Sequence, residues 1–168
     1  MTTLYLHGYN STHQNVRTDW LQKLGKVINP LMQYRNFPWD FQYLEKLVLQ
    51  HRPDWIIGSS MGGYFAFHLG NYYRIPTVLL NPALLMTNIV RPDNRLAPTD
   101  SLHTISLGIK DDVIPPQSTR AVLQQLKARY QIFEYNIGHQ TDFEVFLDIC
   151  KKAGLEDNIN GTAHQQSR

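Results

Sequence analysis

Short apolar runs alternate with longer amphipathic stretches along most of the chain. The apolar runs predict six strands, at residues 3–6, 31–37, 54–57, 77–80, 103–107 and 131–135. Apolar residues that recur at helical spacing predict helices between them, at about 17–28, 40–52, 64–72, 115–130 and 142–153. Strands that alternate with helices of this length indicate right-handed crossovers and a mostly parallel sheet. The predicted fold class is therefore α/β, a three-layer α/β/α sandwich with about six strands.

The organisation along the chain predicts a single domain over residues 1–153. Its least regular part is 83–101, which begins apolar and then becomes turn-like. After residue 153 the sequence turns polar, and residues 154–168 are expected to form a flexible C-terminal tail.

Composition and charge narrow the range of functions. A formal net charge of +2, without a cluster of Lys and Arg, gives no indication of a nucleic-acid or membrane partner. The one cysteine, Cys150, excludes an intramolecular disulfide, and its apolar neighbours at helical spacing predict a core position. No set of His, Asp and Glu has the spacing of a metal site, so no metal or cofactor is expected. Without a basic leader or a membrane-length apolar run, the expected location is the cytoplasm.

The stretch from Gly58 to Gly63 has the pattern G-x-S-x-G between a predicted strand and a predicted helix. In that context the pattern is typical of a nucleophile elbow, a sharp turn that exposes a serine hydroxyl above the sheet. Such a turn requires a strained backbone at the serine, and the start of the helix supplies N–H groups where negative charge develops. The pattern favours Ser60 as a nucleophile. The alternative is a glycine-rich turn whose serine only caps the helix.

A nucleophilic serine needs a base and an acid, and the elbow fold places them later in the chain in the order Ser, Asp, His. Of the seven histidines, only His7 and His139 sit in loops just past the ends of predicted strands, and His139 also fits the order. Asp111 and Asp112 both follow the strand at 103–107. We favour Asp111, three residues after a glycine, and Asp112 stays an alternative.

The oxyanion of a tetrahedral intermediate requires two backbone donors. One is the N–H of Met61, directly after the serine, and the other is expected from Tyr9, where Gly8 lets the loop approach closely. His7, Gly8 and Tyr64 are candidates for binding the substrate. For His7 a buried anchor is the more common role, and for Tyr64 an aromatic core position is an equal alternative.

Four separate motifs carry a resemblance to a known family. In chain order they are Leu6-His7-Gly8-Tyr9, Gly58-Ser59-Ser60-Met61-Gly62-Gly63-Tyr64, Gly108-Ile109-Lys110-Asp111-Asp112-Val113-Ile114-Pro115 and Gly138-His139. Together they resemble the α/β-hydrolase superfamily and, with Asn81-Pro82, the small bacterial YqiA/YcfP-type esterases. The resemblance implies a minimal hydrolase fold without the first two strands of larger members, and Ser60, Asp111 and His139 as a catalytic triad. Residues 83–101 are too short for a full cap domain, and a partial lid is the alternative role for this segment.

The resulting hypothesis is a serine hydrolase that cleaves carboxylic esters or acyl thioesters through an acyl-enzyme intermediate. Its expected partner is a small-molecule acyl substrate, with no nucleic acid, membrane or cofactor involved. Two alternatives are an acyltransferase that uses the same site and a non-catalytic binding protein that keeps the hydrolase fold. A nucleotide site at Gly58–Gly63 is disfavoured, because the stretch lacks the phosphate-binding lysine and the G-x-G-x-x-G spacing.

Overall fold

The computed structural model describes residues 1–34, 41–85, 101–126 and 128–156 of the chain. Its elements are β1 (Thr2–Leu6), α1 (Val16–Leu24), β2 (Lys26–Ile28), α2 (Phe41–His51), β3 (Trp55–Ser59), α3 (Met61–Tyr73), β4 (Thr77–Leu80), β5 (His103–Gly108), α4 (Pro116–Leu126), β6 (Tyr130–Tyr135) and α5 (Phe143–Lys152). The six strands form one sheet in the order β2-β1-β3-β4-β5-β6, and each neighbouring pair is parallel. The predicted α/β class is confirmed.

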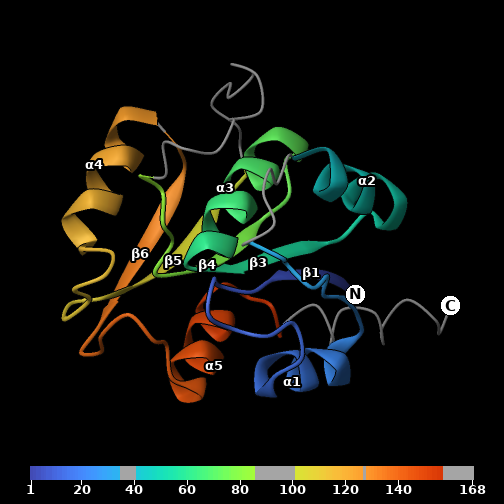
Figure 1. The fold of residues 1–168 in the computed structure, drawn as a ribbon, viewed down its shortest axis with the longest axis horizontal. Coiled ribbons are helices and arrows are strands. Elements are labelled where there is room, and N and C mark those ends of the chain that lie inside the picture. The colour runs from blue at the N-terminus through green and yellow to red at the C-terminus, as the bar shows by residue number, and fades with distance from the viewer. Residues whose placement is uncertain (35–40, 86–100, 127, 157–168) are drawn as a thin grey trace, which may run out of the picture.

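The helices lie on both faces of the sheet, as the crossover rule requires. α1 and α5 cover one face, and α2, α3 and α4 cover the other (Figure 1). The chain moves from β1 to β2 in one direction and then returns past β1 to β3, so the direction of winding reverses between β1 and β3. At such a reversal the loops after the two strands separate and leave a crevice at the carboxyl edge of the sheet.

Alternate side chains along each strand enter the two cores, which follows from the two-residue period of a strand. In β1, Leu4 and Leu6 pack in the core under α2, α3 and α4, whereas Tyr5 packs against α1 and α5. In β3, Ile56 packs in the core under α2, α3 and α4, and Ile57 packs in the core on the other face. Because both faces are buried, the central strands read as short apolar runs in the sequence.

The prediction for residues 17–37 is wrong in two respects. The first helix ends at Leu24, where the N–H of Gly25 closes the last turn on the Leu21 carbonyl, and does not reach Ile28. Residues Lys26–Ile28 form β2 instead, starting where the Lys26 N–H donates to the Met1 carbonyl at 3.0 Å. The apolar residues Val27 and Ile28 fit the period of a helix and also that of a strand. Pairing with β1 makes them part of a strand. The strand predicted at 31–37 is absent from residues 31–34, and 35–37 lie outside the described residues.

The remaining predicted elements are confirmed within a few residues, apart from the end of the fourth helix. α4 ends at Leu126, and Tyr130 begins β6 because it pairs with His103 of β5. The first residue of the helix predicted at 40–52 and most of the irregular segment 83–101 lie outside the described residues.

Residues 154–156, the part of the expected tail that the structure describes, include a residue of the core. Leu155 is fully buried, and its N–H donates to the Cys150 carbonyl at 3.0 Å. The ordered chain therefore continues past residue 153, while 157–168 lie outside the described residues. Cys150 is itself buried, as predicted, and burial raises the pKa of its thiol. None of the helices in the described ranges has the length and apolar character needed to cross a bilayer.

A buried histidine joins α3 to the sheet. The His103 imidazole is fully buried, with Nδ1 2.8 Å from Thr77 Oγ1 and Nε2 2.9 Å from Asn71 Oδ1. An amide oxygen only accepts, so Nε2 carries the proton and Nδ1 accepts from the threonine hydroxyl, an arrangement that a neutral ring satisfies. Burial lowers the pKa of His103 from 6.5 to about 3, with a smaller contribution from His68.

This histidine is expected to make folding stability depend on pH. In the unfolded chain His103 titrates near 6.5, and in the folded protein near 3. Between these two pH values only the unfolded state takes up the proton. The contribution of His103 to the free energy of unfolding is therefore complete above about pH 6.5, and it is lost as the pH falls toward about 3. Urea unfolding of His103→Gln should show a slope from about pH 7 to about pH 4.5 that is shallower than wild type by up to about 1.4 kcal/mol per pH unit. His51→Gln, at the end of α2, is the control. Equal slopes for His103→Gln and wild type would contradict the assignment.

Candidate active site

Ser60 occupies a sharp turn between β3 and α3. Its backbone has φ 52° and ψ −115°, a conformation that a non-glycine residue rarely adopts, and this confirms the strained turn predicted from the sequence. The last residue of β4 and the segment after it hold the turn in place. The Ser60 N–H donates to the Leu80 carbonyl at 2.8 Å, and the Ala83 N–H donates to the Ser60 carbonyl at 2.9 Å. The serine side chain makes no capping hydrogen bond to α3, which excludes the alternative of a simple helix cap.

Small residues let the first turn of α3 pack against the strand ends. A Cβ atom at Gly62 would lie 2.1 Å from the Leu6 carbonyl oxygen, and one at Gly58 would lie 2.4 Å from the Gly62 oxygen. Both distances are far below any real contact, so only glycine permits this approach. The elbow pattern thus specifies how closely α3 docks on β1 and β3.

Three side chains predicted from separate parts of the sequence lie together at the carboxyl edge of the sheet. His139 Nε2 is 3.0 Å from Ser60 Oγ, and His139 Nδ1 is 2.8 Å from Asp111 Oδ2. A carboxylate can only accept a hydrogen bond, so Nδ1 carries the proton and donates a hydrogen bond to Asp111. Nε2 then accepts from the serine hydroxyl. The Asp111 side chain is 1% exposed and that of His139 22% exposed. The acid is thus shielded from water while the base remains open to it.

The choice between the two aspartates is clear from their surroundings. Asp111 directs one carboxylate oxygen to His139, and the other accepts the N–H groups of Val113 and Ile114 at 2.9 and 2.8 Å. These bonds fix the orientation of the carboxylate. Asp112 is exposed to solvent. The structure therefore brings Asp111 to the histidine, in agreement with the sequence preference.

Asn81 is a site residue whose role the sequence analysis missed. Its side chain is buried, its Nδ2 donates to the Gly138 and His139 carbonyls at 3.2 and 2.8 Å, and its Oδ1 accepts the Gly108 N–H at 2.7 Å. It therefore joins the end of β4 to the loops that carry Asp111 and His139. The available signal was a polar residue directly after a predicted strand. In the sequence, Asn81-Pro82 contributes only to the family resemblance.

The loop after β1 reaches the serine, as the oxyanion prediction requires. A Cβ atom at Gly8 would lie 3.3 Å from Ser60 Cβ, so the Gly8 backbone packs against the turn. Tyr9 follows at the surface and is 47% exposed, and Met61 begins α3. Both predicted donors thus belong to segments that adjoin Ser60.

The other proposed substrate-binding side chains are buried. His7 donates from Nδ1 to the Gly8 carbonyl and accepts the Met32 N–H at Nε2, and burial lowers its pKa. It serves as a loop anchor, the more common of the two roles considered. Tyr64 is fully buried in the core, with its ring 6.2 Å from that of Phe41. Neither side chain lies on the open surface of the site, because the first turn of α3 and the start of the β1 loop point inward.

The part of the chain that the structure describes contains no group of three or more His, Cys, Asp or Glu side chains arranged to hold a metal ion. The chemistry available at the site is that of a polarised hydroxyl, an imidazole base and a buried carboxylate. That combination suits nucleophilic attack on a carbonyl.

Comparison with known proteins supports the same fold. A model of the uncharacterised protein family UPF0227 matches residues 2–95, more than half of the chain. Among solved structures, a protein of Xanthomonas campestris pv. campestris assigned to the α/β superfamily of hydrolases is 20% identical, with a TM-score of 0.66 over 94% of this chain and 97% of that one.

Two further structures carry more specific descriptions. An α/β serine hydrolase homologue from Coxiella burnetii is 16% identical, with a TM-score of 0.65 over 92% of this chain and 84% of that one. A carboxylesterase from Bacillus cereus is 17% identical, with a TM-score of 0.59 over 94% and 88% of the two chains. At these identities the likeness establishes the α/β-hydrolase fold and not the activity.

Removal of the Asn81 side chain should destabilise the protein markedly. Asn81→Ala leaves the buried Gly108 N–H and two loop carbonyls without their partner, and we expect a loss of about 2–4 kcal/mol in the free energy of unfolding. Asn29→Ala is the control, since the half-buried Asn29 side chain makes one hydrogen bond within the described residues, to the His13 carbonyl. Urea denaturation measures both variants. An equal or smaller loss for Asn81→Ala than for Asn29→Ala would contradict the role of Asn81.

Proposed function

The chain belongs to the uncharacterised protein family UPF0227, and we propose that it is a serine hydrolase that cleaves carboxylic esters or acyl thioesters. The observation that carries the proposal is the continuous series of hydrogen bonds from Asp111 through His139 to Ser60, with distances of 2.8 and 3.0 Å. The fold shared with a serine hydrolase homologue and a carboxylesterase is consistent with it.

In the proposed mechanism the Ser60 hydroxyl attacks the substrate carbonyl. As Oγ bonds to the carbonyl carbon, its proton passes to His139 Nε2, and the buried Asp111 carboxylate stabilises the imidazolium that results. The carbonyl oxygen becomes an oxyanion, for which the backbone N–H groups of Met61 and Tyr9 are the proposed donors. The carbon–oxygen or carbon–sulfur bond then breaks, and the leaving group takes the proton from His139.

Hydrolysis of the acyl-enzyme needs water at the base. The His139 side chain is 22% exposed, so a water molecule can reach Nε2 once the leaving group has departed. This water gives a proton to His139 and attacks the acyl carbon, and the proton returns to Ser60 as the acid is released.

Replacement of the serine should abolish turnover. We expect Ser60→Ala to lower kcat for p-nitrophenyl butyrate by a factor of about 10⁴ or more, because no oxygen remains to form the acyl-enzyme. Wild type should be labelled by a fluorophosphonate at Ser60, located by mass spectrometry, and Ser60→Ala should not. Turnover that persists in folded Ser60→Ala would contradict the proposal.

The two adjacent aspartates provide a matched pair of variants. Asp111→Asn keeps the shape of the side chain but removes the charge that stabilises the imidazolium and favours the wrong ring tautomer, so kcat should fall by about 10⁴. Asp112→Asn, at the exposed neighbour, should retain a rate close to wild type. Steady-state kinetics with the same ester measures both. Equal effects of the two substitutions would refute the assignment of Asp111.

A further inference from the structure

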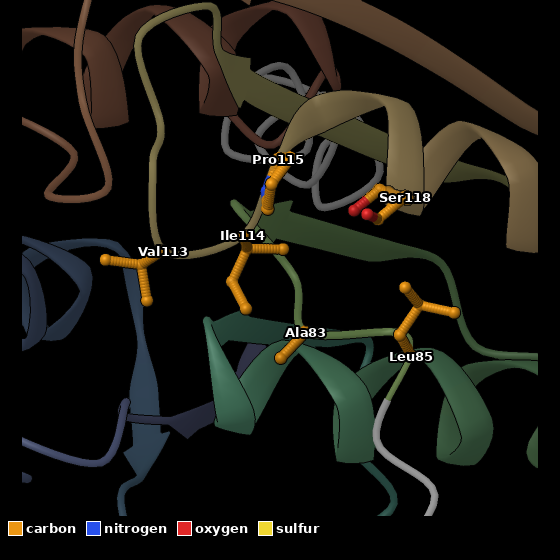
Figure 2. A pocket seen from close by; sticks show the side chains of 7 residues that line it. Ala83, Leu85, Val113, Ile114, Pro115 and Ser118 are labelled. Atoms are coloured by element: carbon orange, nitrogen blue, oxygen red, sulfur yellow. The ribbon is translucent and has the colours of Figure 1, made fainter.

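An apolar cavity of about 250 Å³ lies between the segment that follows β4 and the segment that leads into α4. Figure 2 shows the side chains of Ala83 and Leu85 on one side and those of Ile114 and Pro115 facing them. The residues that line the cavity are Ala83, Leu85, Val113, Ile114, Pro115, Ser118 and Thr119.

Backbone hydrogen bonds connect both walls of this cavity to the site. On one wall, the Ala83 N–H donates to the carbonyl of Ser60 itself. On the other, the N–H groups of Val113 and Ile114 hold the carboxylate of Asp111. The cavity thus includes Ala83, Val113 and Ile114, which contact the proposed nucleophile and acid directly.

The chemistry of the lining selects an uncharged, apolar ligand. None of the lining residues named above carries a charge. The Thr119 hydroxyl is engaged with the Pro82 carbonyl at 3.2 Å, which leaves Ser118 as the other hydroxyl in the lining. Leu85 and Val113 are 55% and 61% exposed, so apolar surface beside the site remains uncovered in the free protein. A hydrocarbon chain would cover it.

We infer that this cavity binds the acyl chain of the substrate, an inference that rests on the proposed function. If each methylene takes about the ~30 Å³ that a water molecule occupies in the liquid, the cavity has room for about eight carbons. The substrates are therefore esters or thioesters of aliphatic acids of short to medium length. Each methylene that enters should raise kcat/KM roughly fourfold, because burial of its surface favours binding in the transition state.

A series of p-nitrophenyl esters from acetate to dodecanoate tests the assignment. In wild type, kcat/KM should rise up to about the octanoyl ester and then stop rising, since longer chains extend beyond the cavity. Ser118→Leu fills part of the cavity and should lower the octanoate-to-acetate ratio of kcat/KM about tenfold. Gln124→Leu, on an exposed part of the same helix, is the matched control and should keep the wild-type ratio.

The outcomes separate the pocket from the chemistry. A ratio that is unchanged in Ser118→Leu, or changed equally in Gln124→Leu, overturns the pocket assignment. So does a Ser118→Leu effect that appears only when the alcohol is varied in a series of acetate esters, because the cavity would then hold the leaving group.

A binding measurement keeps the inference testable without turnover. Sodium octanoate added to Ser60→Ala should shift the methyl NMR signals of Leu85, Val113 and Ile114, whereas sodium acetate should not. If wild type lacks esterase activity but octanoate moves these signals, the proposed function fails and the pocket stands. If wild type turns over esters but octanoate leaves the signals unmoved, the pocket fails and the function stands.

Discussion

The strained backbone at Ser60, with its positive φ, is the constraint on which the rest of the structure depends. A residue with a side chain stays in this conformation only if its surroundings hold it there. The Ser60 N–H donates to the Leu80 carbonyl and the Ser60 carbonyl accepts the Ala83 N–H, and Gly62 lets α3 approach β1 closely enough for the chain to turn. The order β1-β3-β4 at the centre of the sheet follows the same requirement, because β4 must lie beside β3 to supply these bonds.

Asn81 extends this arrangement from the nucleophile to the acid and the base. It follows Leu80 in the chain, and its amide spans the gap between the loops after β5 and β6. A single buried side chain therefore sets the relative positions of the Asp111 and His139 loops with respect to the strand that fixes Ser60. Buried polar groups are costly when unpaired, so a network in which each atom has a partner holds one arrangement and disfavours others.

The same backbone bonds relate the chemistry to the apolar cavity. Ala83 serves both the Ser60 carbonyl and one wall of the cavity, and Ile114 serves both the Asp111 carboxylate and the opposite wall. The two functions share residues because both are built on the carboxyl edge of a parallel sheet, where consecutive loops converge. Reactivity at Ser60 and selection of the acyl group are therefore proposed to depend on one set of loops.

The sequence alone determined the class of fold, the serine and the histidine of the site, and a preference for Asp111 over its neighbour Asp112 as the acid. Buried strands, amphipathic helices and the elbow glycines are local signals, and in a parallel sheet all strand ends converge on one edge, so Ser60, Asp111 and His139 were predictable. The tertiary structure decided the rest. β2 begins at Lys26 because it pairs with β1, Tyr130 is a strand residue because it pairs with β5, and Asn81 and the cavity depend on loops far apart in sequence. Such features depend on contacts between distant segments, which the local pattern of residues does not encode.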